Sequence, residues 1–67
     1  MATCEFKIVG MQDEQCLRLV VNAIQDLPGI GYVEVSLETG EASVEHGTFI
    51  SEADVRAAVE DAGFETR

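Results

Sequence analysis

Basic residues are scarce in this sequence. Its 67 residues include only four Lys and Arg against 13 Asp and Glu, which gives a formal net charge of −9. Proteins hold nucleic acids and anionic membrane surfaces through clusters of Lys and Arg. The charge balance therefore argues against nucleic acid as a partner, and it favours metal cations or proteins with a basic surface.

Long apolar segments are also missing. No run approaches the ~20 apolar residues that a transmembrane helix needs, and the first residues lack the basic-then-apolar pattern of a secretory signal. We therefore expect no membrane insertion and a cytoplasmic location. The two cysteines, Cys4 and Cys16, are then expected to remain thiols because the cytosol is reducing.

Aromatic residues are few as well: three Phe, one Tyr and no Trp. The core must therefore be mainly aliphatic, and the spacing of aliphatic residues predicts the secondary structure. A period of two is typical of half-buried strands, and spacings of three and four are typical of amphipathic helices. In chain order, these patterns predict strand 4–9, helix 14–26, strand 30–37, strand 41–46, a helix that Ser51 caps and Gly63 ends, and a short strand within 64–67.

The boundaries of these elements carry clear signals. Asp13 is a good N-cap for the first helix, and Pro28-Gly29 ends it. The order strand-helix-strand-strand-helix-strand, with two right-handed crossovers, predicts an α+β ferredoxin-like βαββαβ sandwich. In this fold an antiparallel sheet carries both helices on one face, and here the fourth strand is short.

The predicted topology places the candidate functional residues at two opposite ends of the sheet. Residues 10–16, the hairpin turn 38–40 and the Gly63-Phe64 loop share one end, where Asp13, Glu14, Glu38 and Glu41 are expected to gather. Cys4 and His46 lie at the opposite end. If Phe6 lies opposite Val44, Cys4 lies opposite His46 and the two form a candidate ancillary metal pair. The alternative is that His46 simply fills a strand position that takes a ring.

No enzyme constellation is present in the sequence. The single histidine, His46, is far from Cys16 in the predicted topology, so a Cys–His nucleophile pair is excluded. The chain also lacks a phosphate-cradling glycine loop. We therefore expect a protein that is not an enzyme.

Five short motifs occur in an order and spacing that resemble a known family. They are Phe6-x-Ile8-x-Gly10-Met11, Cys16-Leu17-x-x-Val20, Leu27-Pro28-Gly29-Ile30, Val33-x-Val35 and Ala62-Gly63-Phe64. Together they resemble the heavy-metal-associated domain family, which includes cytosolic copper chaperones and N-terminal modules of heavy-metal-transporting P-type ATPases. The resemblance covers about residues 4–65, and it implies that residues 1–67 form a single heavy-metal-associated-like domain.

The resemblance also points to the metal ligands. The family motif is Gly-Met-x-Cys-x-x-Cys, and here Cys16 matches its second cysteine while Asp13 replaces the first. Met11 matches a methionine that packs under the loop, and Phe64 matches an aromatic residue that screens the site. Cu(I) prefers two or three thiolates, whereas Zn(II) and Cd(II) also accept carboxylates. Cys16 and Asp13 are therefore the candidate metal ligands, and the alternatives are that Asp13 is only a helix cap and that Cys16 has no role.

The leading hypothesis is a small heavy-metal-binding or metallochaperone-like protein with a degenerate site. It would bind or deliver Cu(I), Zn(II) or Cd(II), and its expected partners are a metal-transporting ATPase, another basic-surfaced protein or a second copy that supplies another Cys16 thiolate. The alternative is a metal-free interaction or regulatory module that uses the acidic loop end and an exposed sheet edge. A third, weaker hypothesis is a redox-sensing thiol at Cys16.

Overall fold

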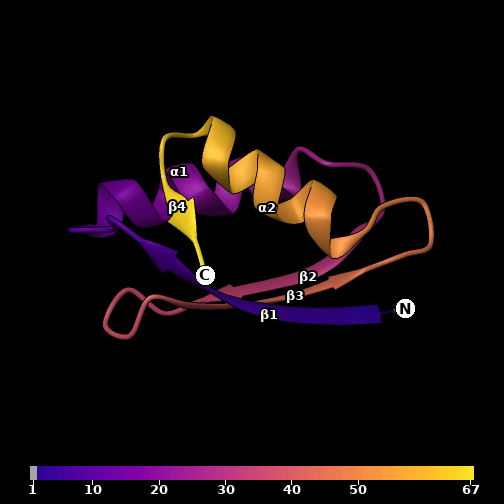
Figure 1. Ribbon diagram of the computed structural model, residues 1–67, viewed down its shortest axis with the longest axis horizontal. Helices are drawn as coiled ribbons and strands as arrows, with labels where there is room; N and C mark the ends of the chain where they lie inside the picture. The colour runs from indigo at the N-terminus through magenta and orange to yellow at the C-terminus, as the bar shows by residue number, and fades with distance from the viewer. Residues whose placement is uncertain (1) are drawn as a thin grey trace.

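The helices and strands follow the predicted order. The computed structural model describes residues 2–67, and two helices lie on one face of an antiparallel sheet (Figure 1). The strand order is β2-β3-β1-β4, so the predicted ferredoxin-like α+β sandwich is confirmed. The elements are β1 (Ala2–Val9), α1 (Glu14–Gln25), β2 (Ile30–Val35), β3 (Glu41–His46), α2 (Glu52–Asp61) and β4 (Glu65–Thr66).

The ends of the elements differ from the predicted ones by at most two residues. β1 begins at Ala2, and α1 ends at Gln25. β2 ends at Val35 because the turn begins at Ser36, whose N–H donates to the Glu41 carbonyl and whose carbonyl accepts the Gly40 N–H, both at 2.8 Å. The turn therefore begins at Ser36, two residues before the start of the predicted turn at residues 38–40.

The pairing of β1 with β3 corrects one prediction. Phe6 lies opposite Ala42, and Cys4 lies opposite Val44 rather than His46. The reason is Gly40, whose carbonyl accepts the Ile8 N–H at 2.7 Å. A Cβ at Gly40 would lie 2.8 Å from the Ile8 carbonyl oxygen, so only glycine fits there, and its position fixes the register two residues away from the predicted one.

The core lies between the sheet and the helices. Each helix contributes two fully buried residues at the spacing of one helical turn, and the central strands contribute their inward-facing residues. Neither helix among residues 2–67 is long and apolar enough to span a membrane. The buried apolar residues are Cys4, Phe6, Ile8, Val20, Ile24, Ala42, Val44, Val55 and Val59.

The two ends of the molecule are distinct, as predicted. The β1–α1 loop and the β2–β3 hairpin lie at one end, and the start of β1 lies with the α1–β2 and β3–α2 loops at the other (Figure 1). Cys4 and His46, near the start of β1 and the end of β3, therefore lie away from the loop that carries Asp13 and Cys16.

Ile24→Ala tests the packing of the core. Ile24 is completely buried, so the change removes apolar contacts and leaves a cavity that costs about 2–5 kcal/mol of unfolding free energy. Urea denaturation measures this loss. Leu19→Ala is the matched control on the same helix, because Leu19 is 52% exposed, and we expect a change within about 0.5 kcal/mol. Equal losses in the two variants would contradict the proposed packing.

Candidate functional site

The loop between β1 and α1 begins beside two partly buried side chains, Met11 and Phe64. Gly10 turns the chain with a φ of 105°, and a Cβ placed there would lie 3.6 Å from Phe64 Cδ1. The Phe64 side chain therefore lies against the start of the loop. Met11, the next residue, packs against the core. The packing of Met11 agrees with what the resemblance implied, and Phe64 lies beside the loop that it is predicted to screen.

Asp13 caps the first helix. Its backbone is extended, its carbonyl accepts the Leu17 N–H at 3.1 Å, and its Oδ1 accepts the Cys16 N–H at 3.0 Å. Hydrogen bonds from the Cys16 backbone N–H, and then from the Cys16 thiol, hold the pKa of the Asp13 carboxyl below its usual range. Asp13 therefore carries its negative charge at neutral pH and complements the positive end of the helix dipole.

Cys16 is the third residue of α1, and it is a free, partly buried thiol. An N-cap side chain turns back over the first helical turn, so the Asp13 carboxylate lies beside Cys16. The helix N-terminus also favours an anion at this position. The fold thus brings the two predicted ligands together, one soft sulfur donor and one hard oxygen donor.

These two residues do not form a complete metal site. Within residues 2–67, no group of three or more His, Cys, Asp or Glu side chains is arranged to hold a metal ion. Cys4 cannot complete the set, because β1 extends roughly 16 Å from Cys4 to Val9 at ~3.3 Å per residue. Within residues 2–67, no third His, Cys, Asp or Glu side chain is therefore placed to complete a metal site at Cys16.

The other end of the sheet offers a poorer site. Burial, and then the charge of Glu52, raise the pKa of the Cys4 thiol, so the thiolate that a metal needs is disfavoured there. His46 is 6% exposed, and its Nδ1 lies 3.1 Å from the Gly47 carbonyl oxygen. The ring fills a buried strand position, as the alternative interpretation of the sequence stated.

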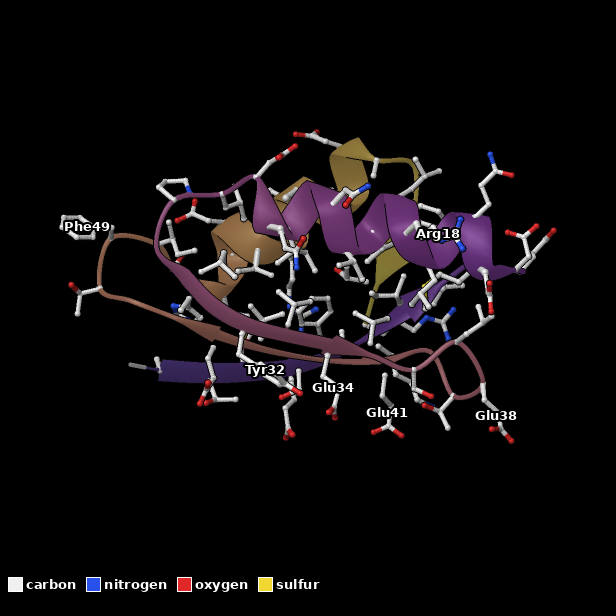
Figure 2. The ribbon with its side chains drawn as sticks, turned by 180° about the vertical axis from the view of Figure 1, so that it is seen from behind. Arg18, Tyr32, Glu34, Glu38, Glu41 and Phe49 are labelled. Atoms are coloured by element: carbon white, nitrogen blue, oxygen red, sulfur yellow. The ribbon has the colours of Figure 1, made fainter. Side chains whose placement is uncertain are left out.

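The acidic side chains near the loop lie on two different surfaces. Asp13 and Glu14 belong to the helix layer, where Arg18 Nη2 lies 3.6 Å from Glu14 Oε2. Glu38 and Glu41 point away from the helices (Figure 2). Arg18 is not among the residues predicted above, although the spacing of four residues between Glu14 and Arg18 is a typical signal of a helical ion pair.

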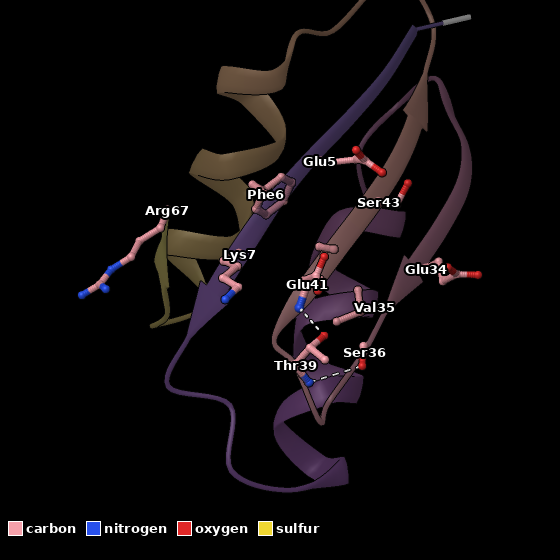
Figure 3. Close-up of a pocket in the computed structure, with 11 residues that line it drawn as sticks. Glu5, Phe6, Lys7, Glu34, Val35, Ser36, Thr39, Glu41, Ser43 and Arg67 are labelled. Atoms are coloured by element: carbon pink, nitrogen blue, oxygen red, sulfur yellow. Dashed lines mark hydrogen bonds between the residues drawn. The ribbon is translucent and has the colours of Figure 1, made fainter.

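The open face of the sheet is hollowed near the hairpin. A cavity of about 720 Å³ lies there, lined by side chains that include Glu5, Lys7, Glu34, Glu41 and Arg67 (Figure 3). Its lining contains no cysteine or histidine, so it lacks the soft donors that a heavy metal prefers. The candidate metal site therefore remains the loop that holds Cys16.

Comparison with known proteins supports a single family. The model of the heavy-metal-associated domain matches residues 5–65. The chain is 30% identical over 60 residues to the copper chaperone CopZ of Bacillus subtilis (strain 168), and the match covers 88% of this chain and 87% of CopZ. It is 35% identical over 63 residues to Copper-transporting ATPase 1 of Rhizobium meliloti (strain 1021), a match that covers 94% of this chain but only 8% of the ATPase.

The solved structures support the same fold. A copper binding domain from HMA7, a P-type ATPase, superposes with a TM-score of 0.95 and 28% sequence identity. The match covers 100% of this chain and 92% of that domain. The ferredoxin-like topology derived from the spacing of apolar residues is therefore shared with a solved heavy-metal-binding module.

Substitutions of Asp13 separate its role as a cap from its charge. Asp13→Asn keeps a good N-cap, whereas Asp13→Ala removes it and should lower Tm by roughly 4 °C. Because the folded-state pKa of Asp13 is depressed, its charge stabilises the fold above the unfolded pKa of about 3.9, and this contribution is lost as the pH falls through the folded value.

The pH dependence supplies the check on this assignment. Thermal melts of the original protein and of Asp13→Asn, measured between neutral and acidic pH, should differ at neutral pH, begin to converge near pH 4 and become equal below the lowered pKa of Asp13. A difference between the two proteins that persists unchanged into acid would show that the Asp13 charge is not what stabilises the helix start.

Proposed function

Because the chain belongs to the heavy-metal-associated domain family, we propose that it is a small metallochaperone-like protein that binds or delivers a metal cation at Cys16 and Asp13. The observation that carries this proposal is the Asp13 carboxylate lying against Cys16 at the start of α1, with Oδ1 3.0 Å from the Cys16 nitrogen. A thiol and a carboxylate on one helical turn can bind one cation together.

The donor set favours borderline cations. A single thiolate with a carboxylate suits Zn(II) or Cd(II), whereas Cu(I) prefers two or three thiolates. One copy of this chain is therefore a weak Cu(I) ligand. Two copies that each contribute Cys16 would provide the two thiolates that Cu(I) requires, so Cu(I) binding is proposed to depend on a homodimer.

The incomplete site is suited to delivery. Two protein donors leave further coordination positions to water or to another protein. A partner with thiolates can enter at these positions and take the cation by ligand exchange, before Cys16 releases it. We propose that such a partner is a metal-transporting ATPase or another protein with a basic surface, because the chain carries a net charge of −9.

A second candidate function follows from the role of Asp13 as a cap. Its Oδ1 is already occupied by the Cys16 N–H, which limits the freedom of the carboxylate to coordinate a cation. The alternative is therefore a metal-free protein-interaction or regulatory module with the same fold. The two functions differ in one measurable property, which is whether Cys16 changes the affinity for a metal.

Cys16→Ala tests the metal function. Loss of the thiolate should weaken Zn(II) or Cd(II) binding by at least about 100-fold, since even residues that only orient a ligand often contribute 10–100-fold. Calorimetric titration under reducing conditions measures the affinity. Cys4→Ala is the matched control, because Cys4 is buried at the opposite end, and it should leave the affinity unchanged. Absence of Zn(II), Cd(II) and Cu(I) binding at micromolar concentration, unaffected by Cys16→Ala, would overturn the proposal.

Asp13→Cys tests whether the scaffold can still hold copper. The second thiol would stand at the N-cap beside Cys16, and it should raise monomer affinity for Cu(I) by at least about 100-fold. Competition with a chromogenic Cu(I) chelator measures the change, and Asp13→Ser serves as a control that keeps a small capping side chain. No gain in Cu(I) affinity would show that the loop cannot bring two donors onto one cation.

A further inference from the structure

The loop at the start of α1 carries half of the donors that a closed metal centre needs. Cys16 supplies one sulfur and Asp13 supplies one carboxylate, and residues 2–67 place no third His, Cys, Asp or Glu side chain beside them. Closed Zn(II) sites are almost always tetrahedral, with four protein donors. A second, identical pair of donors would therefore complete such a site.

The two donors lie together on the first turn of the helix. Asp13 Oδ1 accepts the Cys16 N–H at 3.0 Å, and the Cys16 thiol also donates to this carboxylate. Glu14 is two positions from Cys16, and side chains two residues apart on a helix do not face each other. Glu14 Oε2 lies instead 3.6 Å from Arg18 Nη2. Among the described residues, the donor set of one chain is therefore limited to Cys16 and Asp13.

This corner of the molecule is open to a second molecule. Figure 1 shows the β1–α1 loop at one extreme of the longest axis. Gly10 and residues 12–15 are exposed, and Cys16 is partly exposed behind them. Two copies of the chain can therefore approach end to end, with the first turn of α1 in one copy facing the same turn in the other.

The charge of the chain makes this approach depend on a cation. Each copy carries a net charge of −9, and Asp13 is ionised at neutral pH, so metal-free copies repel each other. Two joined sites bring two carboxylates and two thiolates together, and a divalent cation offsets twice as much of this charge as Cu(I) does. Salt screens the repulsion between distant surface charges over about 10 Å at 0.1 M. Zn(II) and Cd(II) are therefore favoured over Cu(I) for joining two copies through both kinds of donor.

We propose that Zn(II) or Cd(II) joins two copies of this chain in a symmetric dimer, in which one cation is bound by Cys16 and Asp13 of each copy. A two-fold axis passes through the cation, so the same surface meets itself and the assembly closes at two chains. This inference rests on the proposed metal function of Cys16 and Asp13, and it adds the full donor set and the stoichiometry.

The dimer gives the metal site a second state. In one copy alone, two donors leave coordination positions at which an acceptor protein can enter. In the dimer, the second copy fills these positions, so the acceptor and the second copy compete for the same cation. Retention of the cation then increases with the concentration of the chain, and delivery requires that acceptor thiolates displace one copy.

The stoichiometry of the original protein is the first test. Zn(II) is titrated into the full chain with a reductant that contains no thiol, and native mass spectrometry and sedimentation velocity report the assembly. We expect a monomer without metal and a dimer that holds one Zn(II) per two chains. X-ray absorption by the bound zinc should show two sulfur donors at about 2.3 Å and two oxygen donors at about 2.0–2.2 Å.

Substitutions test the donors one by one. Asp13→Asn keeps a good N-cap but removes two carboxylates from the dimer, so it should weaken the Zn(II)-bound dimer at least about 100-fold. Glu38→Gln is the matched control, because it removes the same charge from the hairpin, where Glu38 points away from the helices (Figure 2), and it should leave the dimer unchanged. In an equal mixture of the original protein and Cys16→Ala, no mixed dimer should form, because each copy must supply a thiolate.

Three results would overturn the proposal. They are one Zn(II) per chain without a dimer, a dimer that Asp13→Asn leaves equally stable, and bound zinc with a number of sulfur donors other than two. The first of these, together with loss of binding in Cys16→Ala, would leave the proposed metal function in place. Absence of any Zn(II) or Cd(II) binding would overturn both proposals, so the two failures are distinguishable. If Asp13→Asn fails to fold, the stoichiometry and donor count of the original protein decide.

Discussion

The close contact between Gly40 and Ile8 sets the arrangement of the whole sheet. A Cβ at Gly40 would lie 2.8 Å from the Ile8 carbonyl oxygen, and the φ of 78° suits glycine, so this position has one acceptable residue type. The contact fixes which residues of β1 and β3 face one another, so that Phe6 lies opposite Ala42 and Cys4 opposite Val44. It also holds the hairpin beside the end of β1, where the chain leaves for the loop that carries Cys16.

In the proposed site, Asp13 has two roles, as the cap of α1 and as a donor to the cation. A carboxylate has two oxygens with several acceptor positions, and Oδ1 accepts the Cys16 N–H. The lowered pKa keeps the group ionised, which serves both the helix dipole and a metal. A cysteine at the same place would be a poorer cap, because sulfur is a weak hydrogen-bond acceptor. A carboxylate in place of a thiol therefore strengthens the start of α1, and it replaces a soft sulfur donor with a hard oxygen donor.

The sequence predicts what depends on neighbouring residues and misses what depends on contacts between distant ones. The helix cap at Asp13 and the second helix start, where the Ser51 N–H donates to Asp54 at 3.0 Å, are local and were identified from residue types. The register between β1 and β3 was predicted wrongly, because a shift of two residues leaves the same side chains facing the core. Only the approach of Gly40 to the β1 backbone distinguishes the two registers, and no local pattern contains it.

The small number of donors in the proposed site has a physical consequence for exchange with a partner. A site closed by four protein donors holds its cation as a structural element, whereas a site with open positions can pass it on. In the proposed site, Cys16 and Asp13 supply too few donors to retain a cation against a partner that offers several thiolates.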